Sequence, residues 1–176
     1  MFIFGGRFDQ MGPQQTPVNF YDNRLYAFDP QTKSWSLITA RGQIPCGRRS
    51  HSACMFYLST FFRVFLFSVV NYGGKLYIFG GYNNVMGFHF NDIHEFNPLT
   101  SIWRRIRTHG IANPVPRRRQ CCLVINHRMY MFGGTSPVPT SIFPNHLHEI
   151  QDTDGTRTQL YDQSDLYVFD FGKIIL

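Results

Sequence analysis

An all-β fold, a partial β-propeller of about three blades, is predicted by a unit that recurs along this chain. Three times a short apolar strand ends in a pair of glycines: in MFIFGG at Gly6, in KLYIFGG at Gly81 and in RMYMFGG at Gly134. A second apolar strand, a turn and a tryptophan follow the first two pairs, in NRLYAFDPQTKSW and NDIHEFNPLTSIW, and SDLYVFD follows the third. Each unit therefore predicts one blade, a small sheet of four antiparallel strands.

The residue types of this unit explain each of its elements. Strand segments such as LYIF and LYVF are rich in aromatic and branched side chains, which suit a pleated surface between two neighbouring sheets. Paired glycines allow the positive φ or close backbone approach at which a Cβ would be strained. Asp29 and Asn97 each precede a proline and predict a tight turn. Because a blade cannot bury both faces alone, we expect Trp35 and Trp103 to pack between adjacent sheets.

The units divide the chain into three predicted blades. Their ranges are 1–47, which lacks the innermost strand, 48–116, which contains an anomalous insert at 57–71, and 117–176, which contains a long loop at 135–163. Closed propellers need about four to eight blades, so we expect this chain to be a fragment. On its own it would expose two blade faces, and we expect it to aggregate or to form a swapped oligomer.

The insert and the long loop depart from the repeat. Trp35 and Gly81 are 46 residues apart but Trp103 and Gly134 only 31, and the 15 additional residues correspond to 57–71. This apolar stretch contains Arg63 and is shorter than the roughly 20 residues that span a bilayer. Its Phe, Leu, Ser and Val bias is typical of translated T-rich DNA, so a retained intron is the preferred hypothesis and a functional hydrophobic insert the alternative. The proline-containing segment 135–163 predicts a surface loop.

The composition favours an anionic partner and argues against catalysis. The net charge is +6, and of the 17 basic residues all are arginine except Lys33, Lys75 and Lys173. The planar guanidinium suits bidentate pairing with a carboxylate or phosphate. The four cysteines form no CxxC and the seven histidines show no ligand spacing, so we expect no metal, no cofactor and no disulfide. The sequence contains no recognisable nucleophile, base and orienting group, and we therefore predict a non-catalytic binding module.

Two runs of arginines define the candidate binding site. Arg48-Arg49 and Arg117-Arg118-Arg119 each open the innermost strand of a predicted blade, at the end where the glycine pairs lie. These runs should share one rim of the central channel with Arg7, which follows Gly6, and a concave basic mouth concentrates field on an anion. The predicted peptide-binding residues are Arg7, Arg48, Arg49, Ser50, Tyr82, Asn83, Arg117, Arg118 and Arg119. For Arg48 and Arg117 a packing role, with hydrogen bonds to loop carbonyls, remains open beside ligand contact.

The segments GRRSHSA from Gly47, KLYIFGGYN from Lys75, RRRQCC from Arg117 and MFGGTSP from Met131 resemble the kelch-repeat propellers. They are most similar to a small group of these that serve as substrate receptors of a Cullin-2 RING ubiquitin ligase and recognise C-terminal degrons. The resemblance implies that the terminal carboxylate of a substrate protein enters the basic mouth. By motif position, Arg7 and Arg49 are the residues that would bind it.

The same resemblance sets the expected partners. Substrate proteins would bind through their C-terminal peptides, and the elongin and cullin adaptors would bind only a full-length parent protein. We expect a cytoplasmic protein with no membrane contact, and an association with chromatin keeps a nuclear role open. The alternative function is a general kelch scaffold for protein interactions, on chromatin or on the cytoskeleton.

Overall fold

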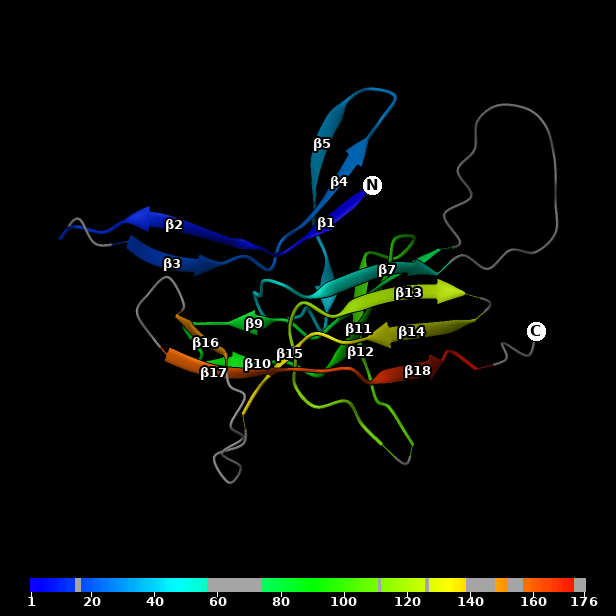
Figure 1. Ribbon diagram of the computed structural model, residues 1–176. Coiled ribbons are helices and arrows are strands. Elements are labelled where there is room, and N and C mark those ends of the chain that lie inside the picture. Colours follow the sequence, from blue (N-terminus) through cyan, green and yellow to red (C-terminus); the bar gives the residue numbers. More distant parts are fainter. Residues whose placement is uncertain are drawn as a thin grey trace.

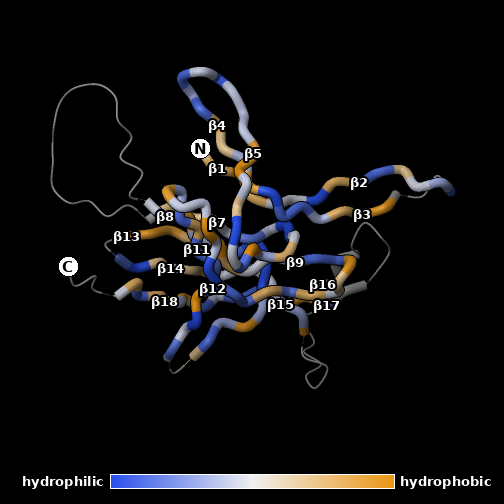
Figure 2. Tube along the Cα trace, turned by 180° about the vertical axis from the view of Figure 1, so that it is seen from behind, coloured by the Kyte–Doolittle hydropathy of each residue, from blue (hydrophilic) through white to orange (hydrophobic). Residues whose placement is uncertain are grey.

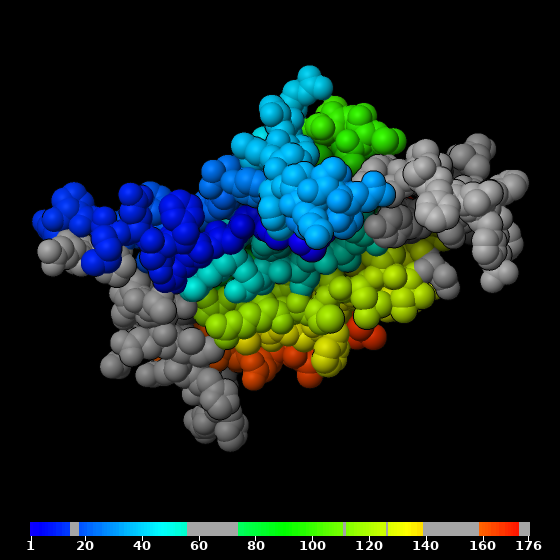
Figure 3. Space-filling model, turned by 90° about the horizontal axis from the view of Figure 1, so that it is seen from above, coloured from blue at the N-terminus to red at the C-terminus, as the bar shows by residue number. Residues whose placement is uncertain are grey.

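The computed structural model describes residues 1–14, 17–56, 74–110, 112–125, 127–138, 148–151 and 157–172. The described residues contain strands and turns only, which confirms the predicted all-β fold (Figure 1). Three main sheets are stacked in the order of the sequence, and Figure 3 shows them as successive layers from blue to orange. The predicted insert at 57–71 lies outside the described residues. Within the described part, no helix has the length and apolarity that a membrane crossing requires.

Each main sheet corresponds to one repeat unit, except that β6 from the range 1–47 joins the second sheet. The first contains β1 (Phe2–Phe4), β4 (Leu25–Asp29) and β5 (Ser34–Ile38), in that order. The second has the order β6-β12-β11-β8-β7, from β6 (Arg41–Gly42), β12 (Ile102–Ile106), β11 (Ile93–Asn97), β8 (Lys75–Phe79) and β7 (Ser52–Phe56). The third contains β13 (Cys121–Ile125), β14 (Arg128–Phe132) and β18 (Leu166–Asp170). All strand pairs are antiparallel except β6 with β12.

A second, smaller sheet follows each glycine pair, and the three project to the same side of the stack (Figure 1). They are β2 (Arg7–Met11) with β3 (Pro17–Tyr21), β9 (Tyr82–Asn83) with β10 (Phe88–His89), and β15 (Thr135–Pro137) with β17 (Arg157–Asp162) and β16 (His148–Gln151). The prediction of a plain surface loop over 135–163 is therefore wrong, because this segment pairs into a three-stranded sheet.

The glycine pairs and turns adopt the geometry that their residue types favour. Gly80 and Gly81 have φ values of +65° and +102°, and a Cβ on Gly81 would lie 2.9 Å from the Arg49 carbonyl oxygen. Only glycine therefore fits where this chain segment passes the inner strand. In the turns, Asp29 Oδ1 accepts a hydrogen bond from the Gln31 N–H at 2.9 Å and Asn97 Oδ1 accepts one from the Leu99 N–H at 2.9 Å.

The core lies between the main sheets, where apolar residues of facing strands meet (Figure 2). Between the first and second sheets Trp103 is buried, with its ring centroid 5.3 Å from that of Phe4 and 5.1 Å from that of Phe96. Between the second and third sheets the buried residues are Tyr77, Phe79, Ile93, Met129 and Met131. Each interface thus combines one face of one sheet with the opposite face of the next.

The two tryptophans differ, and the prediction that both are core residues is wrong for Trp35. Trp103 is 1% exposed but Trp35 is 51% exposed. Trp35 lies on β5 of the first sheet, on the face that corresponds to the buried face of the second. Among the described residues no sheet packs against that face, so the indole of Trp35 contacts solvent where Trp103 contacts Phe4.

Candidate functional site

The first arginine of each run is part of the core structure. Arg48 donates from Nη1 and Nη2 to the two carboxylate oxygens of Asp92, at 2.5 and 3.1 Å. Its Nη1 also donates to the Gly80 carbonyl at 3.1 Å and its Nε to the Cys46 carbonyl at 3.0 Å. The Arg48 residue is 0% exposed, and its guanidinium lies 3.8 Å from the centroid of the Phe90 ring. Arg48 therefore ties the start of the inner strand to the glycine pair and to the start of β11.

Arg117 repeats this arrangement in the third sheet. It donates to Asp165 at 2.5 and 2.8 Å, to the Gly133 carbonyl at 3.0 Å and to the Val115 carbonyl at 3.1 Å, and it too is 0% exposed. The assignment of Arg48 and Arg117 to the peptide-binding surface is therefore corrected to a packing role. The physical reason is that internal acceptors engage Nε, Nη1 and Nη2 of both side chains, and protein covers them completely.

The second arginine of each run is attached by its backbone to the segment after the glycine pair. Arg49 and Tyr82 exchange two backbone hydrogen bonds of 2.9 Å, and Arg118 and Thr135 exchange two of 2.9 and 2.8 Å. These bridges place Arg49 and Arg118 at the end of the inner strands from which the small sheets project. The glycine pairs thus position the second arginines as well as ending the strands.

Tyr82 brings the two second arginines together. The Cζ atom of Arg118 lies 4.6 Å from the centroid of the Tyr82 ring, and that of Arg49 lies 5.6 Å from it. The Tyr82 hydroxyl donates to Asn84 Oδ1 at 2.6 Å, which fixes the ring. Arg118 is 1% exposed, whereas Arg49 is half-buried. An aromatic face thus holds two guanidinium groups from neighbouring sheets beside one another.

Arg7 joins this group through an aspartate. It donates from Nε and Nη2 to Asp9 Oδ1 and Oδ2, at 2.8 and 2.7 Å. The hydrogen bond from Arg7 lowers the pKa of Asp9, with a further contribution from the charge of Arg49. The Gly6 N–H donates to the Arg48 carbonyl at 2.9 Å, so the next residues along the chain, Arg7 of the first repeat unit and Arg49 of the second, follow directly from this link. We call Arg7, Arg49, Tyr82 and Arg118 the mouth cluster.

The other predicted residues lie around the mouth cluster in different roles. Ser50 and Arg119 are exposed, have φ values of +55° and +62°, and are linked by a hydrogen bond of 2.8 Å from the Arg119 N–H to the Ser50 carbonyl. Asn83 is buried and supports the backbone, because its Nδ2 donates to the Gly47 carbonyl at 2.8 Å and its Oδ1 accepts from the Met86 N–H at 3.1 Å. Of these three, Ser50 and Arg119 are open to a ligand.

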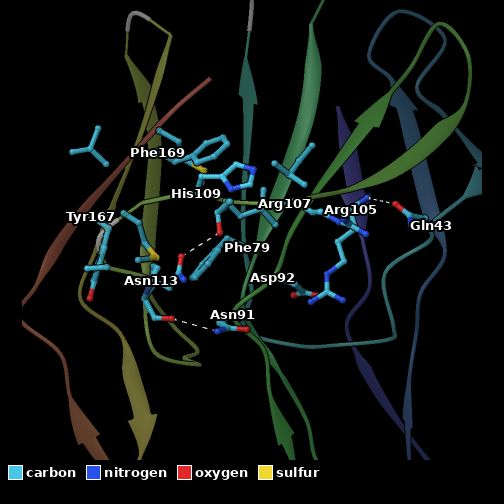
Figure 4. A pocket seen from close by; sticks show the side chains of 18 residues that line it. Gln43, Phe79, Asn91, Asp92, Arg105, Arg107, His109, Asn113, Tyr167 and Phe169 are labelled. Atoms are coloured by element: carbon cyan, nitrogen blue, oxygen red, sulfur yellow. Dashed lines mark hydrogen bonds between the residues drawn. The ribbon is translucent and has the colours of Figure 1, made fainter. Parts of the chain in front are cut away.

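Two hollows adjoin these residues or lie near them. One of about 400 Å³ lies beside the mouth cluster and is lined by Tyr82, Asn84, Gly87, Phe88, His89, Pro116 and Pro137. The other, of about 660 Å³, lies between the second and third sheets and is drawn in Figure 4. Phe79, Met129 and Phe169 supply apolar parts of its wall, whereas Arg105 and Arg107 also line it. The sequence analysis identified neither hollow.

The acidic partners of the site were also missed from the sequence. Asp92 and Asp165 each stand directly before the strand that pairs with the glycine-ended strand, in NDI and SDL. That shared position was the available signal. It is not specific, because Arg24 occupies the same position in the first unit, where its carbonyl accepts from the Gly5 N–H as that of Asp92 accepts from the Gly80 N–H.

Comparison with known proteins gives the class. Residues 1–134 match the family described as the KLHDC2/KLHL20/DRC7 Kelch-repeats domain, and the chain therefore belongs to the kelch-repeat family. It is 38% identical over 171 residues to Kelch domain-containing protein 3 of Homo sapiens and of Bos taurus, which is 97% of this chain and 37% of those proteins. It thus spans little more than a third of their length.

Two other relatives match this chain at lower sequence identity. Host cell factor 2 of Homo sapiens is 28% identical over 140 residues, which is 77% of this chain and 16% of that protein. The N-(sulfonatooxy)prop-2-enimidothioate sulfolyase of Thlaspi arvense is 26% identical over 150 residues, which is 85% of this chain and 38% of the enzyme. The chain is accordingly a kelch-repeat protein related to Kelch domain-containing protein 3.

Proposed function

We propose that Arg7, Arg49, Ser50 and Arg119 bind the C-terminal carboxylate of a substrate protein, while Tyr82 and Arg118, which are 3% and 1% exposed, support Arg49 from within the fold. The observation that carries this proposal is that Arg49 and Arg118 both approach the ring of Tyr82, while the hydrogen bond from the Gly6 N–H to the Arg48 carbonyl brings the chain at Arg7 next to the chain at Arg49. Arginine is the side chain best suited to hold a carboxylate in a bidentate pair. A site that gathers cations from three sheets favours an anionic chain end over a neutral one.

Asp9 competes with a substrate carboxylate for Arg7. Its carboxylate is 43% exposed and already pairs with Arg7. A substrate carboxylate therefore has to share Arg7 with Asp9 or displace it, whereas Arg119 is exposed to solvent. Asp9 thus acts as an internal competitor that marks where a carboxylate fits.

The hollow beside Tyr82 would take the residue that precedes the terminal carboxylate. Its wall includes Phe88, Pro116 and Pro137, and its volume of about 400 Å³ suits one or two side chains. This arrangement is that of a peptide receptor that captures a terminal carboxylate and reads a neighbouring side chain.

More specifically, we propose that the chain supplies the substrate-recognition surface of a Cullin-2-type E3 ubiquitin ligase. Its similarity to Kelch domain-containing protein 3 and the carboxylate-sized basic site support this assignment. The elongin and cullin adaptors would contact other parts of a longer protein, since the chain spans 37% of that relative. The chain itself then acts as a non-catalytic module.

Peptide calorimetry tests the proposal directly. A pool of decapeptides with free carboxylates and the same pool with amidated C-termini are titrated into the purified chain. Loss of hydrogen bonds to a charged group costs about 1.5–3 kcal/mol, so amidation should weaken binding by tenfold or more. Acetylating the N-termini should change nothing.

A matched pair of variants locates the effect. Arg49→Gln should remove the preference for the free carboxylate. Arg128→Gln should keep it, because Arg128 is an exposed arginine that pairs with Asp170 on the third sheet. Equal affinity of the unmodified chain for both pools would refute the proposal.

The alternative, a general kelch scaffold on chromatin, is favoured by the net charge of +6. It predicts binding to duplex DNA that weakens steeply as salt rises and shows little sequence preference. Fluorescence anisotropy with a labelled random duplex at several salt concentrations measures this. Salt-insensitive or absent binding would exclude the chromatin version.

A further inference from the structure

The outer face of the third sheet exposes residues that are core residues in the other two sheets. The last residue before each glycine pair is opposite the first residue of the next strand in the sheet: Phe4 opposite Leu25, Phe79 opposite Ile93 and Phe132 opposite Leu166. The first four of these side chains are between 1% and 6% exposed. Phe132 is 55% exposed and Leu166 is 60% exposed. The third sheet thus presents the same apolar pair with no sheet against it in the described structure.

The opposite face of the first sheet exposes the complementary set. In the second sheet Trp103 is opposite Phe96, and together with Leu76 and Ile78 they pack against Phe4 and Leu25. The corresponding pair in the first sheet is Trp35 opposite Phe28, with ring centroids 4.9 Å apart compared with 5.1 Å for Trp103 and Phe96. The indole that inserts between sheets is therefore already in place on the first sheet.

Other exposed residues on the Trp35 face of the first sheet also correspond to buried residues of the second sheet. Counted back from the glycine pairs, Met1 and Ile3 occupy the positions of Leu76 and Ile78. Leu76 and Ile78 are 4% and 0% exposed, whereas Met1 and Ile3 are 65% and 44% exposed. The two end faces of the stack are thus the two halves of an interface that the chain forms internally.

We propose that two copies of this chain associate head to tail through these faces, with Trp35 of one copy packed on Phe132 and Leu166 of the other. The first-to-second-sheet interface is the template, because it joins the equivalent residues within one chain. Such a contact is heterologous, and repetition of one rotation closes it into a ring. Two stacks of three main sheets would make six blades, within the range of about four to eight in closed propellers.

The cavity in Figure 4 shows why the indole is central to this contact. Phe79 and Ile93 line it from the second sheet, and Met129, Met131 and Phe169 line it from the third. These are the counterparts of the residues that surround Trp103 in the preceding interface. The described part of the third sheet supplies no counterpart of Trp103, and a hollow of about 660 Å³ remains there. In the proposed contact between copies, the indole of Trp35 takes the position that Trp103 has between the first and second sheets.

Association is measured first on the unmodified chain. Sedimentation velocity over a range of concentrations should give a species of twice the chain mass of 20.5 kDa. In chain labelled with 5-fluorotryptophan, the ¹⁹F resonance of Trp35 should shift with concentration while that of Trp103 stays constant. The variant Trp35→Phe assigns the two resonances.

Complementary variants then test the geometry. Trp35→Asp and Phe132→Asp should each be monomeric, because either one disables both contacts of a symmetric pair. An equimolar mixture of the two variants retains one intact contact and should recover dimers of lower affinity. Leu99→Asp, at a turn residue that is 73% exposed, should leave association unchanged.

Four results would overturn the inference. They are a monomer at all concentrations, association that survives Trp35→Asp or Phe132→Asp, a mixture that stays monomeric, and assemblies larger than two copies. Circular dichroism of each variant verifies that it is folded. Peptide binding at the mouth cluster is independent of these outcomes, since no residue of that cluster lies on either face.

Discussion

Consecutive arginines at the start of the same strand have opposite roles in this protein. Arg48 is buried in a bidentate pair with Asp92, whereas Arg49 is half-buried and approaches the ring of Tyr82. The third sheet repeats the difference in partners, since Arg117 pairs with Asp165 and Arg118 approaches the Tyr82 ring, but there both arginines are buried. Successive side chains of an extended backbone point to opposite faces, so one residue of the pair enters the sheet packing and the next turns to the mouth. Position along the chain, rather than residue type, therefore separates the arginine that stabilises the fold from the one that we propose binds a ligand.

The largest expected loss of stability comes from replacing Arg48, the buried arginine. Arg48→Met leaves the Asp92 carboxylate without its cation, and losing one partner of a buried ion pair costs about 3–5 kcal/mol. Urea denaturation followed by circular dichroism measures the free energy of unfolding. Arg128→Gln is the control, because the side chains of Arg128 and its partner Asp170 are 57% and 54% exposed, and solvent-exposed ion pairs contribute little to stability. A loss below 1 kcal/mol for Arg48→Met would contradict a structural role.

An intermediate effect on stability is expected from His51, whose pKa responds to burial and to the charge of Arg48. Burial lowers the pKa of His51 to about 4, and the charge of Arg48 adds to the shift. The unfolded chain, with a pKa of about 6.5, therefore binds a proton before the folded chain does, and stability falls as the pH falls from 6.5 to 4.

His51→Gln should flatten this part of the curve of unfolding free energy against pH. His94, whose pKa is also lowered to about 4 by burial, leaves a residual slope that the variant does not remove. Urea denaturation at intervals between pH 4 and 7.5 measures both chains. An unchanged slope would show that His51 is not held neutral in the folded state.

The smallest effect on stability is expected at the second arginine. Arg49→Gln should change the free energy of unfolding by no more than about 0.5 kcal/mol, while it abolishes the preference for a free carboxylate. The same denaturation assay, run beside the peptide titration, separates the two readouts. A stability loss equal to that of Arg48→Met would remove the contrast between the two positions.

The parts of the fold that depend on local chemistry were predictable. Glycine pairs at positive φ, strands ending at those pairs and turns capped by Asp29 and Asn97 all follow from residue type and spacing. The acidic partners were not predictable, because Asp92 lies 44 residues from Arg48 and Asp165 lies 48 residues from Arg117. Three strands within 135–163 were missed, since the prolines and polar residues of this segment favour a loop although its strands pair with one another.

The mouth cluster was predictable only in outline. The expectation that Arg7 and Arg49 act at one place followed from which end of a strand each occupies. The approach of Arg49 and Arg118 to the Tyr82 ring depends on how the small sheets project from the main ones, which no spacing along the chain specifies.

By itself the sequence determined the repeat, the strand order within each unit and the positions where only glycine fits, because these depend on neighbours along the chain. Only the tertiary structure decided which of two equivalent tryptophans is buried and which of two adjacent arginines is enclosed. Trp103 and Trp35 have the same local context, yet one meets Phe4 of the preceding sheet and the other meets solvent. Burial is a property of the sheet on the other side of the interface, and the local sequence does not contain that sheet.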